Sequence, residues 1–265
     1  MLSISNVSVS RGGKLLLQSV QMGVCPGKIT AIIGPNGSGK STLLKTMAGV
    51  MECDSGQITL EQRALATWPR KQLARKLAYL PQSSERPLGM SVEEVVACGR
   101  YAHLPPWASL RRKDHEAIER ALQDTEMTHK SSAQVDNLSG GEMQRVWLAT
   151  ILAQGSDLLL LDEPSSYLDL SHQLDLLALI QRLNREQGKT IVLVIHDLNQ
   201  ALHWCDEIVV MQAGKIIKAG DINLLQDAQL LRHVFNLSAQ YIQLEENARP
   251  LLHATRLSKV HEVKR

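Results

Sequence analysis

Apolar and polar residues alternate over several segments of the chain, which is typical of strands with one buried face. Positions 2–9 follow this pattern and predict an antiparallel edge strand, and positions 15–24 predict a second strand. Near the other end, 207–211 and 216–219 are joined by Ala-Gly and predict a hairpin. These segments indicate antiparallel β-structure at both ends of the chain.

Other segments are short, nearly continuous apolar runs, as expected of parallel strands that are buried on both faces. They are Thr30 to Ile33, Leu158 to Leu161 and Ile191 to Ile195. Helical spacing follows the first run over 40–48 and separates the other two over 171–187. In the second helix, Leu174, Leu177 and Ile180 are expected on one apolar face. Alternating strands and helices predict an α/β core.

The stretch 84–154 is different, because it carries helical periodicity and no strong strand signal. Residues 91–99 and 113–124 have apolar side chains at helical spacing, and a last helix is predicted to begin near Ser139. Strand signals return after this stretch. We therefore predict a helical block inserted into the α/β core.

Composition narrows the functional classes. The chain has 265 residues, 21% of them charged, with a formal net charge of +2. The concentrated basic stripe of nucleic-acid-binding proteins is missing, so no nucleic-acid partner is expected. Apolar runs fall well short of the ~20 residues that cross a bilayer. Four cysteines without a CxxC pair favour neither a disulfide framework nor a zinc site and suit a reducing cytosol. We expect a soluble chain whose membrane role, if any, comes through a partner.

A glycine-rich loop lies between the first apolar strand and its helix. Residues 34–42 read GPNGSGKST and match the G-x-x-x-x-G-K-[ST] pattern that cradles phosphates. Glycines allow close backbone approach to a ligand, and the helix beginning near Lys40 adds its positive dipole end. Lys40 supplies a charge for the β- and γ-phosphates, and Ser41 a hydroxyl for Mg²⁺. The predicted nucleotide contacts are Gly34, Pro35, Asn36, Gly37, Ser38, Gly39, Lys40, Ser41 and Thr42. The loop alone does not choose among kinases, GTPases and transport ATPases.

Polar residues follow three of the predicted strands. The run LLLLDE ends in Asp162, which is placed to hold Mg²⁺, and Glu163, which is placed to accept a proton from the attacking water. His196 follows the next apolar run and is positioned for a γ-phosphate contact, and Gln82 follows a short run at 77–80. Acids and a histidine after strands are often merely solvated. Beside a phosphate loop, the functional interpretation is favoured.

A second anion-binding turn occurs about a hundred residues after the first. Residues 138–142 read LSGGE and precede a helical run, so Ser139, Gly140 and Gly141 would form a helix N-terminus that can bind phosphate. One ATP needs only one such loop. Two chains related by a two-fold axis, each placing LSGGE against the partner's phosphate loop, would use both.

The set as a whole resembles a known family. GPNGSGKST, Gln82, LSGGE, LLLLDE, the SYLD segment at 166–169 and His196 occur in the order and spacing of ABC-transporter nucleotide-binding subunits. The resemblance covers roughly positions 1–237. It implies a P-loop NTPase (RecA-like) α/β fold with an antiparallel β edge and an inserted helical subdomain. It also implies a single domain over 1–265, with the core at 1–83 and 155–240, the helical subdomain at about 84–154 and an extension at 241–265.

The same resemblance assigns roles to the residues that match. Lys40 becomes the phosphate lysine, Ser41, Gln82 and Asp162 become Mg²⁺-site groups, Glu163 the catalytic base and His196 the switch histidine. Ser139, Gly140 and Gly141 would contact the γ-phosphate of ATP held by the partner chain, and Asp169 would lie in the loop that crosses the dimer interface. Two positions depart from the family pattern. Arg11 lies near the position where the family usually has an aromatic residue that stacks on adenine, and Tyr167 is a variation within the SYLD segment.

Three longer segments are similar to the ATPases of type II importers. They are GRYAHLPPW at 99–107, SSYLDLSHQLDLL at 165–177 and HDLNQALHWCDEIVVMQAGKI at 196–216. The resemblance implies an ATPase that uses ATP and Mg²⁺ to drive import of a ferric siderophore, with haem or vitamin B12 as alternative cargo. Implied partners are a second copy of this chain, an integral-membrane permease dimer and a periplasmic or lipoprotein substrate-binding protein. The implied location is the cytoplasmic face of the inner membrane.

Three other functions use related machinery. A soluble ABC ATPase acting on ribosomes or DNA usually carries two cassettes or a long coiled coil, and the sequence shows neither. A small-molecule kinase would use the phosphate loop but has no place for LSGGE and the acidic pair. An exporter ATPase shares the same motor and stays an alternative.

Overall fold

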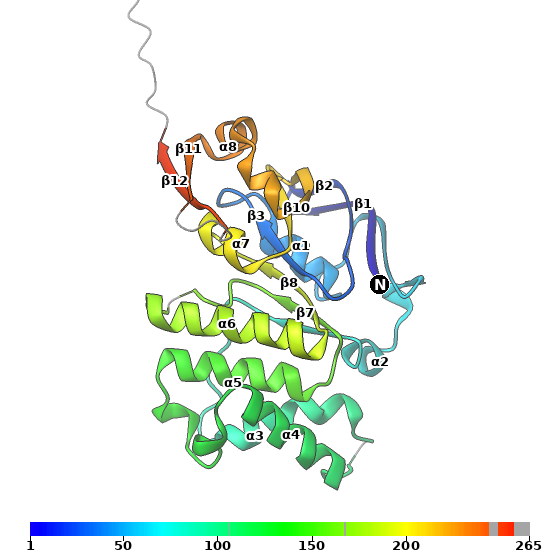
Figure 1. Ribbon diagram of the computed structural model, residues 1–265. Coiled ribbons are helices and arrows are strands. Elements are labelled where there is room, and N and C mark those ends of the chain that lie inside the picture. The colour runs from blue at the N-terminus through cyan, green and yellow to red at the C-terminus, as the bar shows by residue number, and fades with distance from the viewer. Residues whose placement is uncertain (106, 167, 244–248, 257–265) are drawn as a thin grey trace, which may run out of the picture.

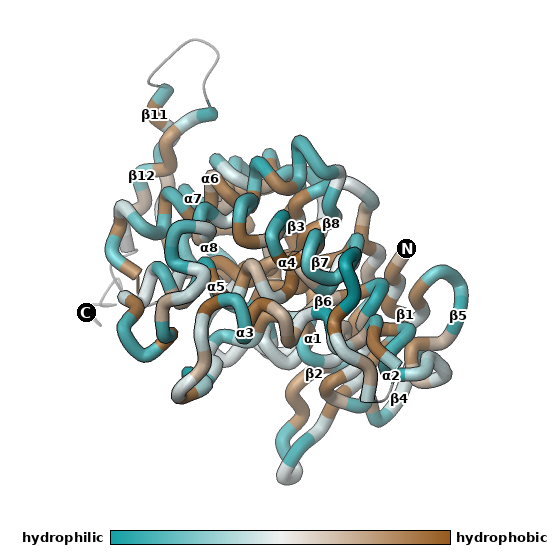
Figure 2. Tube along the Cα trace, turned by 90° about the horizontal axis from the view of Figure 1, so that it is seen from below, coloured by the Kyte–Doolittle hydropathy of each residue, from teal (hydrophilic) through white to brown (hydrophobic). Residues whose placement is uncertain are grey.

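The structure of the protein is a computed structural model that describes residues 1–105, 107–166, 168–243 and 249–256. Tyr167 and positions 244–248 and 257–265 of the expected extension lie outside the described residues. Figure 1 shows a central sheet, a group of helices α3, α4 and α5 at one end of the molecule, and the hairpin β11–β12 at the opposite end. Figure 2 shows polar residues on the outlying loops and hydrophobic ones mostly in the packed interior.

A six-stranded sheet forms the centre of the fold, in the order β10-β9-β3-β8-β7-β6. All neighbours are parallel except the pair β9–β10. The three nearly continuous apolar runs are confirmed as strands in which every residue of β3, β7 and β8 is buried. The strands are β3 (Ile29–Ile33), β6 (Leu77–Leu80), β7 (Leu158–Leu161), β8 (Thr190–Val194), β9 (Glu207–Gln212) and β10 (Lys215–Asp221).

The predicted hairpin near the end of the chain is confirmed as β9–β10. Ala213 and Gly214 join the strands with φ values of 48° and 78°. Positive φ at both central positions matches the right-handed twist of the flanking strands, and glycine adopts it most readily. This turn lies beside the phosphate loop, because Gly214 N donates to Ser38 O at 2.9 Å.

A second, antiparallel sheet has the order β2-β1-β4-β5. Its strands are β1 (Leu2–Arg11), β2 (Lys14–Gly23), β4 (Ser55–Leu60) and β5 (Arg63–Ala64). The expectation that the first strand lies at an edge was wrong, because β1 pairs with β2 on one side and β4 on the other. The sequence of β4, SGQITL, has too few apolar residues to be noticed as a strand, and it supplies the second partner.

Helices and the antiparallel sheet cover opposite faces of the central sheet. Successive residues of β3, such as Ala31 and Ile32, point to opposite faces of the sheet and belong to different hydrophobic clusters. One cluster includes α6, α7 and α8, and the other includes α1 with β1, β2 and β4. The helices are α1 (Lys40–Met47), α2 (Arg70–Ala74), α6 (Leu170–Gln187), α7 (Leu198–Trp204) and α8 (Ala228–Phe235), with 3₁₀ turns η1 (Leu65–Thr67) and η5 (Ile222–Gln226).

The apolar face expected for α6 needs one correction. Leu177 and Ile180 are buried against the sheet, but Leu174 is 43% exposed. Positions 174 and 180 are six residues apart, which places them about 120° from each other at roughly 100° per residue. The buried face instead includes Leu176, on the side of Leu177 and Ile180.

The segment between β6 and β7 is helical and has its own core. It contains α3 (Val92–Ala97), α4 (Arg112–Asp124), α5 (Gly140–Ala153) and the 3₁₀ turns η2 (Cys98–His103), η3 (Thr128–Lys130) and η4 (Val135–Asn137). Val92, Ile118 and Val146 are among its fully buried contacts. Arg100 and Asp114 form a buried ion pair at 2.9 Å, and Arg100 also donates to Ala153 O. This pair joins η2 to the start of α4 and the end of α5, so the three helices form one unit.

The hairpin of β11 (Leu237–Ile242) and β12 (Leu251–Arg256) packs against α7. Asn199 forms two hydrogen bonds with the backbone of Leu252, and Arg249 donates to the carbonyls of Leu202 and Cys205 at the end of α7. Among the described residues, none of the helices has the length and hydropathy needed to cross a bilayer.

Candidate nucleotide site

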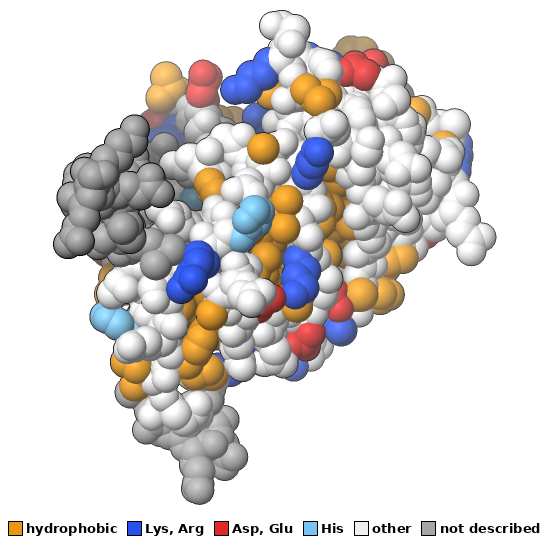
Figure 3. Space-filling view, turned by 90° about the horizontal axis from the view of Figure 1, so that it is seen from above, with side chains coloured by type: hydrophobic (Ala, Val, Ile, Leu, Met, Phe, Trp, Pro, Cys, Tyr) orange, Lys and Arg blue, Asp and Glu red, His pale blue; other side chains and the backbone are white. Residues whose placement is uncertain are grey.

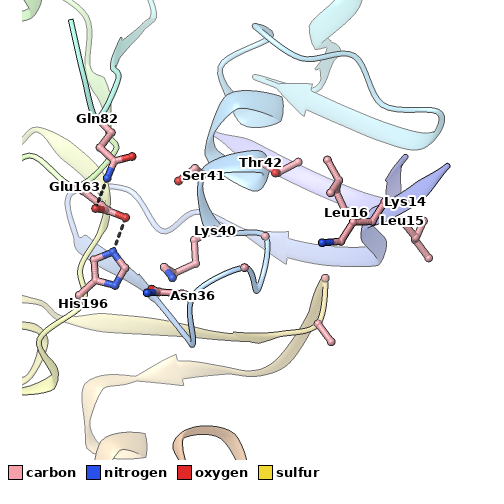
Figure 4. A pocket seen from close by; sticks show the side chains of 14 residues that line it. Lys14, Leu15, Leu16, Asn36, Lys40, Ser41, Thr42, Gln82, Glu163 and His196 are labelled. Atoms are coloured by element: carbon pink, nitrogen blue, oxygen red, sulfur yellow. Dashed lines mark hydrogen bonds and ion pairs between the residues drawn. The ribbon is translucent and has the colours of Figure 1, made fainter. Parts of the chain in front are cut away.

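The polar groups predicted from strand ends lie along one edge of the central sheet. The loop from Gly34 follows β3, Gln82 follows β6, Asp162 and Glu163 follow β7, and His196 follows β8. These four strands are parallel, so their carboxyl ends meet at the same edge. Figure 4 shows the side chains of Gln82, Glu163, His196 and Lys40 on this edge.

Close packing fixes the phosphate loop against two neighbouring strands. Gly34 has a φ of +150°, and a Cβ on it would overlap the carbonyl oxygen of Met211 in β9. A Cβ on Gly39, at φ +102°, would lie 2.8 Å from the carbonyl oxygen of Leu16 in β2. Both positions therefore require glycine. The loop ends at Lys40, the first residue of α1, whose helix N-terminus favours anions.

Lys40 is only 5% exposed, and its partners among the described residues are backbone carbonyls rather than carboxylates. Its Nζ donates to the carbonyl oxygens of Gly34 at 3.0 Å and Pro35 at 3.2 Å. Burial lowers the pKa of the Lys40 ammonium, although the charges of Glu163 and Asp162 partly oppose this effect. An arriving phosphate would restore the favourable environment of the charge, so this lysine is prepared for an anionic ligand.

Ser41 and Asp162, two of the three groups predicted to hold Mg²⁺, are bonded to each other, whereas the third, Gln82, bonds Glu163. The hydroxyl of Ser41 donates to Asp162 Oδ1 at 2.8 Å, and Tyr79 of β6 donates to Oδ2 at 3.4 Å. Burial is the main cause that raises the pKa of Asp162, while the Ser41 hydrogen bond lowers it. Hydroxyl and carboxylate oxygens at the phosphate loop are the donor set that Mg²⁺ prefers, so the residues fit this ion.

Glu163 is held between two other predicted residues. Gln82 Nε2 donates to Glu163 Oε2 at 2.6 Å, and His196 Nε2 bonds Glu163 Oε1, as the dashed lines in Figure 4 mark. The side chain of Glu163 is 13% exposed and that of His196 is 46% exposed. Glu163 also has a positive φ of 51°, which is unusual for a residue other than glycine. Three strand ends thus hold one carboxylate at the mouth of the loop.

These groups border a pocket of about 800 Å³. The sequence-predicted residues that line it are Asn36, Gly37, Gly39, Lys40, Ser41, Thr42, Gln82, Glu163 and His196. Its far end is formed by Lys14, Leu15 and Leu16 of β2 and by the Ala213-Gly214 turn, which sequence reasoning did not include. They come from β2 and from the turn after β9, and the close packing of Gly39 on β2 and Gly34 on β9, together with the hydrogen bond from Gly214 N to Ser38 O, brings them to the loop.

Arg11, considered at the usual place of an adenine-stacking aromatic, is outside the lining of this pocket. Its guanidinium forms an ion pair with Asp54 at 3.2 Å and donates to the carbonyl of Glu52 at 2.8 Å. The side chain is therefore directed to the loop before β4. Figure 4 shows Lys14, Leu15 and Leu16 at the end of the pocket away from Glu163.

The second anion-binding turn does not line this pocket. Ser139 caps α5 in a capping box with Glu142, and Gly140 and Gly141 form its first turn. A Cβ on Gly141 would lie 2.8 Å from the ring of His172, which in turn bonds the α6 cap Asp169 at 2.7 Å. Ser139, Gly140, Gly141 and Asp169 thus form a separate group in the same chain, apart from the phosphate loop.

Comparison with known proteins identifies the fold and the family. Residues 17–166 match the ABC transporter family. The chain is 40% identical to the iron(3+)-hydroxamate import ATP-binding protein FhuC of Bacillus subtilis, over 94% of this chain and 93% of that protein. It is 39% identical to the hemin import ATP-binding protein HmuV of Shewanella denitrificans, over 95% of this chain and 100% of that protein.

A solved structure agrees with the sequence comparisons. It is described as an inward-facing conformation of a putative metal-chelate type ABC transporter, and a chain of it superposes with a TM-score of 0.83. The match covers 97% of each chain at 28% sequence identity. The predicted P-loop NTPase α/β fold with its antiparallel β-structure and helical insertion is confirmed. One polypeptide carries a phosphate loop, an acidic strand end and the LSGGE turn at 138–142, which is called the signature turn below. The chain belongs to the ABC transporter family as an ATP-binding, ATP-hydrolysing subunit.

Proposed function

We propose that two copies of this chain bind two MgATP at their interface and hydrolyse them. Each ATP would contact the phosphate loop of one copy and Ser139, Gly140 and Gly141 of the other, with Asp169 at the crossing. The observation that carries this proposal is that the pocket around Lys40 is lined without the signature turn of its own chain. A two-fold axis would bring the two groups together twice.

The residues of the pocket support a simple mechanism. Lys40 leaves the carbonyls of Gly34 and Pro35 to bind the β- and γ-phosphates, where its charge stabilises the transferring group. Glu163 accepts a proton from the attacking water, and His196 contacts the γ-phosphate after releasing Glu163. Mg²⁺, when bound, would be held by Ser41, Asp162 and Gln82 and would neutralise phosphate charge. Closure of the two chains is favoured because ATP binds the closed pair better than the open one.

The split site predicts that ATP turnover depends on protein concentration. Each chain holds only half of the groups around one ATP, so specific activity per chain should rise steeply with concentration and approach zero for dilute monomers. Phosphate release measured from nanomolar to micromolar chain, beside the sedimentation of the same samples, tests this. A constant rate per chain in strictly monomeric samples contradicts the proposal. Release without any added acceptor also separates it from a small-molecule kinase.

The cargo proposed for the assembled transporter is an iron chelate, most directly a ferric siderophore. The support is the similarity to an iron(3+)-hydroxamate import protein, while the similarity to a hemin import protein keeps haem as the alternative, with vitamin B12 as a further one. Partners would be an integral-membrane permease dimer and a periplasmic or lipoprotein substrate-binding protein. The chain would then act at the cytoplasmic face of the inner membrane.

Uptake by cells tests the cargo. Cells with the intact chain should accumulate a labelled ferric hydroxamate, and cells with Glu163→Gln in its place should lose most of that uptake, because the permease stays present without its motor. Labelled haem and cobalamin are measured in parallel. Loss of haem or cobalamin uptake alone would replace the siderophore assignment and leave the ATPase mechanism intact.

Domain limits follow from the same resemblance. We propose one ABC ATPase domain over 1–265, with the core at 1–83 and 155–240, the helical subdomain at about 84–154 and the extension at 241–265. The helical part is supported by its separate hydrophobic core around Val92 and Ile118. Such a unit can rotate against the α/β core when nucleotide binds.

A further inference from the structure

An internal anion occupies the turn that is proposed to receive the γ-phosphate. Glu142 follows Gly141, and its Oε2 accepts from Ser139 N at 2.9 Å and from Ser139 Oγ at 3.0 Å. In return, Glu142 N donates to Ser139 Oγ at 3.3 Å. The hydroxyl and one amide of the turn are therefore already bonded to a carboxylate in the free chain.

Lys130 of η3 compensates this carboxylate. Its Nζ forms an ion pair with Glu142 Oε1, and both side chains are about one-third exposed. The hydrogen bond from Lys130, followed by that from the Ser139 backbone, lowers the pKa of Glu142 to about 2. Glu142 is thus fully charged at neutral pH, and Lys130 balances that charge beside a helix N-terminus.

Backbone hydrogen bonds on both sides of Lys130 fix its position in the helical subdomain. Its backbone N donates to Met127 O at 3.0 Å, and its carbonyl accepts from Ala133 N at 2.9 Å. Arg145, the next cation along α5, is bonded to Glu126 at 2.9 Å and so does not take over the role. Among the described residues, Lys130 is therefore the cation that forms an ion pair with Glu142, and it comes from a different segment of the helical subdomain, while Arg86 donates to the neighbouring Leu138 carbonyl.

From these contacts we propose that Lys130 is a positioning residue for the signature turn. By neutralising Glu142 and binding its other carboxylate oxygen, it lets the Ser139 hydroxyl exchange Glu142 for the γ-phosphate of ATP held by the partner copy. This inference rests on the proposed split site. Without Lys130, an unbalanced carboxylate would repel the triphosphate and retain the serine hydroxyl.

ATP-driven association measures this effect directly. In the Glu163→Gln background, which keeps ATP intact, sedimentation velocity with MgATP gives the dimer dissociation constant. Lys130→Met should raise it at least tenfold, whereas adding Glu142→Gln to Lys130→Met should return it to within threefold of the parent. The increase in the dissociation constant caused by Lys130→Met should also become smaller as the salt concentration rises, because salt screens the repulsion between Glu142 and the triphosphate. The matched control is Lys76→Met, which removes an exposed ion pair with Glu61 on another part of the chain. This substitution should leave the dimer dissociation constant unchanged.

Each outcome separates the two levels of the proposal. A parent that stays monomeric with MgATP overturns the split site and this inference together. If the parent dimerises with MgATP and the Lys130→Met variant has the same dimer dissociation constant, only the inference about Lys130 is overturned. The inference is also overturned by a Lys130→Met defect that Glu142→Gln fails to repair or that salt leaves unchanged, because Lys130 would then act through the fold rather than through charge.

Discussion

Glu163→Gln is expected to abolish ATP turnover while ATP still binds and the two chains remain associated. General acid–base catalysis contributes roughly 10²- to 10⁴-fold, and glutamine has no basic carboxylate to accept a proton from water. The substitution keeps the length of the side chain, so Gln82 at 2.6 Å still has an oxygen to bond. Phosphate release under saturating ATP, with bound nucleotide counted after gel filtration, checks both parts of the expectation.

The matched control for this substitution is Glu186→Gln. Glu186 is an exposed glutamate on α6, remote from the strand ends, and the same chemical change there should leave turnover at the parent value. Undiminished hydrolysis by Glu163→Gln would remove Glu163 from the role of base. Hydrolysis lost together with ATP binding would instead show that Glu163 supports the loop rather than the proton transfer.

Local pattern was enough to predict the centre of the fold and most of the pocket. Strands buried on both faces favour apolar residues at nearly every position, and that pattern identified β3, β7 and β8, although β3 and β8 each also bury one threonine. Because parallel strands end at one edge, residues as distant in sequence as Gln82, Glu163 and His196 could be expected to lie together, and they are hydrogen-bonded.

What sequence pattern missed depends on long-range packing. The strand β4 has few apolar residues and is stabilised by its partner β1, so β1 was wrongly expected at an edge. The far end of the pocket comes from Leu16 and the Ala213-Gly214 turn, which long-range packing and the hydrogen bond from Gly214 N to Ser38 O bring into place. The direction of the Arg11 side chain depends on Asp54, a partner 43 residues away that no local sequence motif could predict.

The expectation that no nucleic acid is a partner stays a prediction, and it rests on the charge of the chain. Figure 3 shows one face of the molecule, on which basic, acidic, histidine and hydrophobic side chains are interspersed rather than gathered by charge. The net charge of the chain is +2, and a charge this small gives little of the phosphate-backbone attraction that nucleic-acid binding requires.

Gly34→Ala should both destabilise the fold and weaken ATP binding. Its φ of +150° disfavours any residue with a Cβ, and the added atom would overlap the Met211 carbonyl in β9, so the loop must move away from the sheet. Strain and overpacking together cost about 3 kcal/mol or more. Because the loop amides and Lys40 would shift with it, ATP affinity should fall at least tenfold. Urea unfolding and titration with a fluorescent ATP analogue measure the two effects.

Gly188→Ala separates the clash from the backbone conformation. Gly188 ends α6 at φ +64° with no atom within 4 Å of an added Cβ, so only the conformational cost of about 1 kcal/mol applies, and ATP affinity should stay at the parent value. Equal losses of stability in the two variants, with ATP affinity intact in both, would contradict the close contact between Gly34 and β9. A larger loss of stability at Gly34 combines the overlap with Met211 and the different backbone angle of +150°. A loss of ATP affinity at Gly34 but not at Gly188 means that the phosphate loop is shaped by the strand beside it, because an added Cβ meets a β9 carbonyl only at the first of these two sites.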